Sequence, residues 1–162
     1  MRKPTQLINA LLLLVVISSS LYAHCQVPCG IYGDQTRFDM LREHITTIEK
    51  SMKQIDELSG DKSTNMNQLV RWINNKEKHA DEFTEIVTYY FLAQRLKVKD
   101  RIDASLVDYQ NKLTALHQMM VYSMKCKQTT DLENANKLKS LVDEFEELYF
   151  SKEDIKHLKD HK

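Results

Sequence analysis

The most constraining feature of this sequence is that its last 102 residues, after Gly60, contain neither glycine nor proline. These two residue types mark most tight turns and interrupt both helices and strands. A sheet of short strands joined by tight turns is therefore disfavoured over this length. Long helices are the expected alternative.

Hydrophobic periodicity agrees with this expectation. Apolar residues recur every three or four positions in four segments, which is the spacing of one face of an α-helix. The polar residues after Gly60 separate the first two segments, and Thr130 with Glu133 has the spacing of a capping box for the start of the fourth. The four segments span residues 38–55, 66–91 (with a polar interruption at 74–78), 102–120 and 132–149. The sequence therefore predicts an all-α protein whose residues 34–162 form an antiparallel, up-down four-helix bundle.

Residues 1–23 have the pattern of a signal peptide that is removed on export. Two basic residues precede an apolar run at 11–17, and Ala23 stands at the expected cleavage site. The run is too short to span a bilayer comfortably. We therefore expect cleavage before His24, export to the periplasm or the extracellular space, and no membrane attachment afterwards.

The cleaved chain has 139 residues, the length of one domain. It carries 21 basic and 23 acidic residues. A nucleic-acid-binding protein shows a basic excess or a basic stripe, and this near balance argues against such a partner.

The sequence His24-Cys25-Gln26-Val27-Pro28-Cys29-Gly30-Ile31-Tyr32 opens the cleaved chain. Cleavage frees the His24 amine, which joins the His24 imidazole, the Cys25 amide nitrogen and the thiolates of Cys25 and Cys29 as available metal ligands. Pro28 and Gly30 favour a tight turn between the thiolates, and the bond before a proline is where a cis peptide costs least. We call residues 24–33 the hook.

Nickel suits this donor set better than zinc does. Two nitrogens and two thiolates in a plane fit the square-planar preference of Ni(II), whereas zinc prefers a tetrahedral arrangement. Anionic amide and thiolate donors also stabilise Ni(III), and the His24 imidazole is placed to bind the oxidised ion as an axial ligand.

Two other interpretations stay open at this point. In an oxidising compartment Cys25 and Cys29 can form a disulfide, and the protein is then an exported helical-bundle binding protein. Alternatively, the hook belongs to a nickel or copper carrier without catalytic activity.

The pattern His-Cys-x-x-Pro-Cys-Gly-x-Tyr at 24–32 resembles the nickel hook of nickel-containing superoxide dismutases, with every fixed position present. The resemblance implies an antiparallel four-helix bundle assembled as a homohexamer, with one nickel ion per chain. It also implies disproportionation of superoxide to O2 and H2O2, with the metal alternating between Ni(III) and Ni(II).

The resemblance assigns roles to individual residues. His24 supplies the amine and the axial imidazole, Cys25 the amide nitrogen and a thiolate, and Cys29 the second thiolate. Pro28 becomes the cis turn. Tyr32 lines the substrate pocket, and Tyr90 matches a second tyrosine near it, so that these two tyrosines are the catalytic candidates.

Matches around the metal ligands are less complete. Gln26 stands where the family often has an acidic residue. Asp39 is the nearest match to a carboxylate that orients the axial imidazole, a role that a metal-bound imidazole generally requires. Lys78 or His79 is the nearest match to a basic residue that shares this work.

The remaining histidines have no partner at the spacing of a two-metal site, and the Glu-x-x-His motif of di-iron bundles does not occur. His44, His117, His157 and His161 are therefore expected to be isolated surface or structural residues. Cys126 is expected to be a reduced, partly buried thiol that packs as a small apolar side chain.

Overall fold

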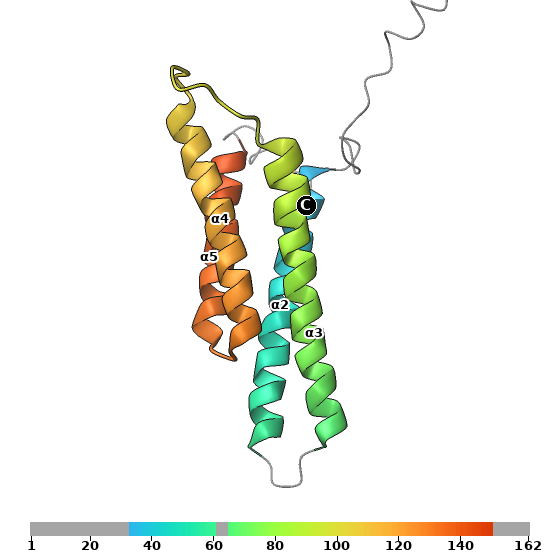
Figure 1. The fold of residues 1–162 in the computed structure, drawn as a ribbon. Helices are drawn as coiled ribbons and strands as arrows, with labels where there is room; N and C mark the ends of the chain where they lie inside the picture. Colours follow the sequence, from blue (N-terminus) through green and yellow to red (C-terminus); the bar gives the residue numbers. More distant parts are fainter. Residues whose placement is uncertain (1–32, 61–64, 151–162) are drawn as a thin grey trace, which may run out of the picture.

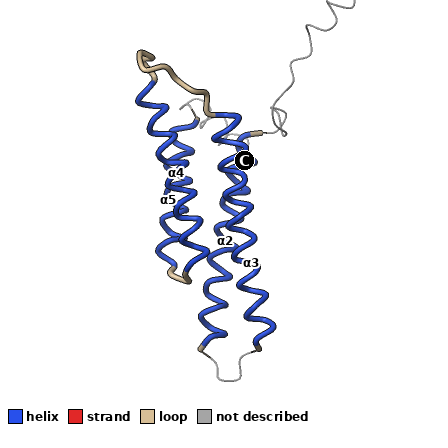
Figure 2. The backbone as a smooth tube through the Cα atoms, in the orientation of Figure 1, coloured by secondary structure: helices blue, strands red, loops and turns tan. Residues whose placement is uncertain are grey.

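A computed structural model describes residues 33–60 and 65–150 of the chain. These residues form two helical hairpins that pack side by side (Figure 1). Figure 2 shows only helices and loops along the described chain, and the predicted all-α bundle is confirmed. The elements are α2 (Asp34–Ser59), α3 (Met66–Glu85), the π-helical stretch η1 (Ile86–Arg95) that continues α3, α4 (Leu106–Gln128) and α5 (Leu132–Tyr149).

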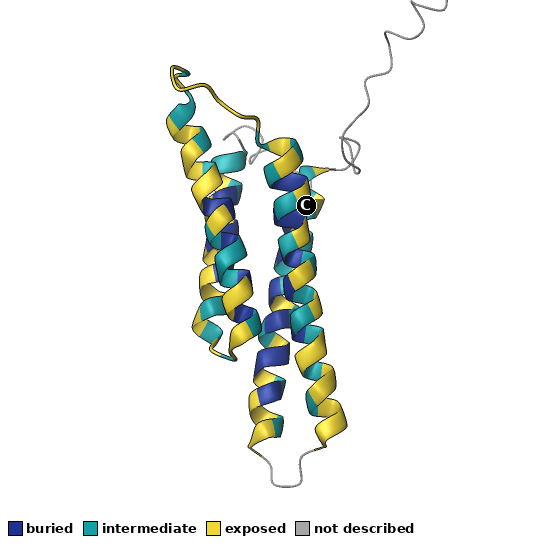
Figure 3. Ribbon diagram, in the orientation of Figure 1, coloured by how far each residue is buried: buried dark blue, intermediate teal, exposed yellow. Residues whose placement is uncertain are grey.

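The apolar faces of the helices meet along the bundle axis and form one core (Figure 3). The six apolar residues that follow helical spacing in the segment 38–55 are all buried: Phe38, Leu41, Ile45, Ile48, Met52 and Ile55. Phe38, Phe91, Phe145 and Tyr149 form an aromatic cluster at the end of the bundle where α2 begins, with ring centroids 4.9 to 5.7 Å apart. Tilted and edge-on contacts of this kind add stability beyond the area that they bury.

In the second and third segments, 66–91 and 102–120, the buried part is shorter than the apolar spacing. Met66 is 63 % exposed, and Ile73 is 38 % exposed, because α2 and α3 extend beyond the turn between α4 and α5, so that neither α4 nor α5 covers this part of α3 (Figure 1). Ile102 is 97 % exposed and lies in the loop 96–105, since α4 begins only at Leu106. The apolar spacing of the segments 66–91 and 102–120 therefore begins before the parts of α3 and α4 that are buried.

The start of α5 also differs from the prediction. The N-cap is Asp131, whose side chain accepts a hydrogen bond of 3.0 Å from the Glu133 amide. Thr130 lies one position too early for this role, so the capping box predicted from Thr130 and Glu133 is wrong. An aspartate directly before the first helical residue satisfies the free amide more effectively.

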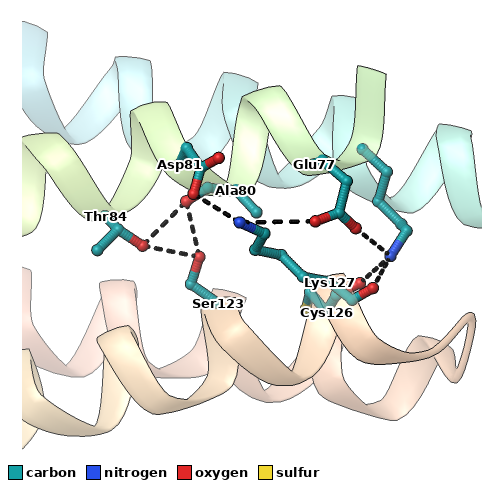
Figure 4. Close-up of polar contacts among 8 residues, drawn as sticks. Glu77, Ala80, Asp81, Thr84, Ser123, Cys126 and Lys127 are labelled. Atoms are coloured by element: carbon teal, nitrogen blue, oxygen red, sulfur yellow. Dashed lines mark hydrogen bonds and ion pairs between the residues drawn. The ribbon is translucent and has the colours of Figure 1, made fainter. Parts of the chain in front are cut away.

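A polar seam joins α3 to α4 inside the bundle (Figure 4). The buried Ser123 hydroxyl donates to the Ala80 carbonyl over 2.9 Å and lies 3.0 Å from the Thr84 hydroxyl. The buried Lys76 ammonium, 5 % exposed, donates to the carbonyls of Cys126 and Lys127 at the end of α4, with a distance of 2.7 Å to the first. These contacts fix the register of the two hairpins.

Within the described residues, no helix has both the length and the apolar content required to cross a membrane.

Candidate active site

Most of the hook lies outside the described residues, which begin at Gly33. The predicted metal ligands His24, Cys25 and Cys29, the turn residues Pro28 and Gly30, and Tyr32 therefore remain sequence predictions. The structure describes the part of the bundle to which the hook is joined.

Asp34, the first residue of α2, is the acceptor at the centre of this end of the bundle. It accepts hydrogen bonds from the Tyr90 hydroxyl, from the Arg95 guanidinium and, over 2.7 Å, from the Tyr149 hydroxyl. Arg95 Nε also donates to the Tyr149 hydroxyl over 3.1 Å. We call Asp34, Tyr90, Arg95 and Tyr149 the Asp34 cluster; its members come from α2, η1 and α5.

These contacts set the charges of the cluster. Burial alone raises the pKa of Asp34, but the hydrogen bonds from Arg95, Tyr90 and Tyr149 outweigh it, and the pKa is lowered overall. Burial, followed by the hydrogen bond to Asp34, raises the pKa of Tyr90 to about 12, and the same causes raise the pKa of Tyr149 to about 12. At neutral pH the carboxylate is therefore charged, and both phenols keep their protons.

Tyr90 is held firmly within η1. It is only 3 % exposed, whereas the neighbouring Tyr89 is 52 % exposed. The guanidinium carbons of Arg37 and Arg95 lie 5.0 and 5.7 Å from the centroid of the Tyr90 ring, within the range of cation–π contacts. A π-helical stretch is uncommon and often occurs at functional sites. The predicted catalytic residue Tyr90 is thus a fixed hydrogen-bond donor that reaches the residue directly after the hook.

A pocket of about 640 Å³ opens beside the Asp34 cluster. Asp34, Arg95 and Tyr149 supply its polar wall, and Phe91 and Phe145 supply part of its apolar wall. The end of the bundle that carries the hook therefore combines a cavity with fixed polar groups, the usual form of a small-molecule site.

The residues predicted to support the imidazole are not gathered into one group. Asp39 is exposed on α2, and Lys78 Nζ lies 3.6 Å from Glu82 on its own helix. His79 Nδ1 lies 2.9 Å from Nδ1 of His44. In the described part of the chain, no hydrogen bond or ion pair links Asp39 to Lys78 or His79, and their relation to the hook stays a prediction.

Two features of this region were missed from the sequence. Asp34, Arg95 and Tyr149 were not singled out; the available signal was an acidic residue in the first turn of a helix that follows the hook. The expectation that His44 is isolated is wrong, because His79 faces it across the α2–α3 interface. Burial, and secondarily the proximity of His79, lowers the pKa of His44.

The hook offers an amine, an imidazole, an amide nitrogen and two thiolates, and nitrogen and sulfur donors of these kinds fit nickel. A comparison with protein families finds the family described as nickel-containing superoxide dismutase over residues 19–153, a range that includes the whole hook and all four helices. The chain belongs to the nickel-containing superoxide dismutase family. It is an oxidoreductase that uses nickel to convert superoxide to O2 and H2O2. No curated protein and no solved structure matches it.

Proposed function

We propose that this superoxide dismutase holds one nickel ion per chain at the hook, with His24, Cys25 and Cys29 as the ligands. His24 supplies its amine and imidazole, Cys25 its amide nitrogen and thiolate, and Cys29 its thiolate. When bound, the nickel supplies a one-electron redox couple between Ni(III) and Ni(II). The family assignment favours this enzyme over the disulfide-linked binding protein and the metal carrier that the sequence left open.

Covalent continuity supports a site at the α2 end of the bundle. Cys29 is four residues from Gly33, so the chain allows at most about 14 Å between their Cα atoms. Pro28 and Gly30 provide the turn that brings Cys29 back toward Cys25. The length of the chain therefore lets the second thiolate lie beside the Asp34 cluster and its pocket.

The observation that carries the assignment of the pocket is the hydrogen bond from Tyr90 to Asp34. Tyr32 precedes the described residues by one position, and Tyr90 reaches the residue that follows Gly33. We assign to Tyr32 the role of lining the substrate pocket, and to Tyr90 the role of holding Asp34, a residue of the pocket wall, in place. Because the Tyr90 phenol keeps its proton well above neutral pH and donates it to Asp34, it positions this carboxylate and does not act as a base.

Export and processing belong to the same proposal. Signal peptidase removes residues 1–23 and thereby creates the His24 amine, and the enzyme acts in the periplasm or outside the cell without membrane attachment. The active form is a homohexamer. Exposed apolar side chains on the part of α3 that neither α4 nor α5 covers support an assembly of this kind.

Mass spectrometry, nickel analysis and a superoxide assay on the purified enzyme test the site. We expect a chain that begins at His24, one nickel per chain, and loss of nickel and activity in Cys25→Ser. The control is Cys126→Ala, which removes the buried free thiol outside the hook and should keep both properties. An active, nickel-loaded chain that begins at any other residue contradicts the proposal.

A further inference from the structure

A second group of metal-ligand side chains lies between α2 and α3, in the described part of the chain. His44 comes from α2, and His79 and Glu82 come from α3. The two Nδ1 atoms are 2.9 Å apart, and Glu82 Oε2 lies 3.7 Å from each of them. The side chains of His44 and His79 are 12 % and 22 % exposed, so the imidazoles are partly shielded and still reachable from solvent.

We propose that His44, His79 and Glu82 form a second metal site, distinct from the hook, that binds a divalent cation of the zinc type. Two imidazoles and one carboxylate are the protein ligands of one common class of exchangeable zinc site, in which a water completes the tetrahedron.

The spacing of the donors fits such an ion. Ligand atoms at about 2.0–2.1 Å from a tetrahedral zinc lie about 3.3 Å from one another. The two imidazole nitrogens therefore need to separate by about 0.4 Å, and the Glu82 oxygen needs to approach by a similar distance. Small side-chain rotations supply both movements without displacing either helix.

The helices present these donors in a suitable orientation. His79 and Glu82 are three residues apart and share one face of α3. That face packs on α2, which runs beside α3 and carries His44 (Figure 1). Lys78 Nζ lies 3.6 Å from Oε1 of Glu82, and Oε2 is the oxygen that faces the two imidazoles. Contacts of this kind orient a ligating carboxylate.

The metal-free contact explains why a cation stabilises the group. Two facing ring nitrogens share a single hydrogen bond, in which one donates and the other accepts. A cation contacts both nitrogens and the carboxylate at once. It also links α2 to α3, so binding stabilises the folded hairpin.

The group lies away from the end of the bundle at which α2 begins. His44 follows Asp34 by ten residues, which corresponds to about 15 Å along α2. Its three donors also stand on helices and require no residue of the hook. The proposal is therefore independent of the ligand assignment at the hook.

Calorimetric titration with Zn²⁺ of the nickel-loaded enzyme, cleaved before His24 and otherwise complete, tests the site. Nickel content is measured before and after the titration. We expect one zinc per chain in addition to nickel, and at least tenfold weaker binding in His44→Gln and in Glu82→Gln. His117→Gln, an exposed histidine on α4, is the matched control and should bind zinc as the wild type does.

Thermal unfolding provides a second measurement. Zinc should raise the Tm of the wild type and of His117→Gln, and should raise it much less in the His44 and Glu82 variants. Glu82 is the most exposed of the three ligands, so its variant tests the site even if His44→Gln folds poorly. Absence of zinc binding at one equivalent per chain, zinc uptake only with loss of nickel, or equal affinity in Glu82→Gln overturns the proposal.

Discussion

At Asp34, donors from two other elements of the bundle converge on one carboxylate at the first turn of α2. Its side chain is only 15 % exposed, and a carboxylate at a helix N-terminus is also favoured by the helix dipole. Because the pKa of Asp34 is lowered in the folded state, ionised Asp34 stabilises the fold. That contribution is present above the unfolded pKa of about 4 and is lost as the pH falls through the lower folded value.

Asp34→Asn is therefore expected to reduce the free energy of unfolding at pH 7 by about 1–2 kcal/mol. The difference from the wild type should shrink when the pH is lowered below 4. Urea unfolding at pH 7 and near pH 3 measures both values. Asp39→Asn changes an exposed aspartate on the same helix and should have little effect at either pH. A deficit for Asp34→Asn that is independent of pH would show that its charge is not the cause.

Tyr90→Phe tests the role of the phenol in the pocket. Loss of the hydrogen bond that holds Asp34 in the pocket wall should lower the superoxide dismutase rate about fivefold, the equivalent of about 1 kcal/mol, with nickel content unchanged. Tyr149→Phe removes a second phenol from the same carboxylate and is the matched comparison. It should destabilise the protein to a similar degree and lower the activity less. Equal losses of activity in the two variants would contradict the assignment of Tyr90.

Residue-level predictions from the sequence came from local patterns and from the resemblance to a family. Tyr90 was assigned by resemblance, and it lies at the end of the bundle that carries the hook. Its partner Asp34 is 56 residues away along the chain, and Tyr149 is 115 residues from Asp34. Contacts over such separations depend on which helices pack together, and no local pattern indicates them. The pairing of His44 with His79 was missed for the same reason.

Among the elements, α3 and α4 are joined by a lysine that is almost completely buried. The Lys76 ammonium donates to two carbonyls at the C-terminus of α4, where the helix leaves acceptors unpaired and its dipole favours a positive charge. A nearby carboxylate, Glu77 Oε1, lies 3.1 Å from Lys76 Nζ and offsets part of the cost of burying the charge.

Lys76→Met is expected to lower the free energy of unfolding by about 2 kcal/mol, because it leaves these carbonyls without a donor in a buried setting. Lys78→Met is the control; its side chain is 69 % exposed, and the change should stay within about 0.5 kcal/mol. Denaturant unfolding monitored by circular dichroism measures both. Similar stabilities for the two variants would mean that the Lys76 contacts do not hold α4 in place.

Periodicity predicted the existence and order of the helices better than their ends. The breaker-free sequence left long helices as the expected structure, and each of the four segments forms one. The start of α4 was placed too early because Ile102 continues the apolar spacing, although it lies in a loop. The π-helical stretch η1 also has no counterpart in a pattern of three- and four-residue steps, since an added residue per turn changes which side chains share a face.

At the scale of the whole molecule, the two hairpins differ in length, and the longer one leaves part of α3 uncovered (Figure 1). Met66, Val70 and Ile73 follow helical spacing on this part of α3 and are 63 %, 49 % and 38 % exposed. Scattered apolar residues are normal on a protein surface, but an aligned set on one helix face is typical of an interface. We assign this face to the contacts between chains in the proposed homohexamer.

Val70→Asp places a charge at the centre of that face and should shift the enzyme from hexamers toward smaller species, because a buried carboxylate without a partner opposes association. Multi-angle light scattering across a dilution series measures the mass. Gln68→Glu adds the same charge at an exposed polar position about 160° around the helix from Val70 and should leave the mass unchanged. Since Val70 contributes nothing to the core of its own chain, circular dichroism should show intact helices in both variants. Hexamers that persist in Val70→Asp at low concentration would exclude this face from the assembly.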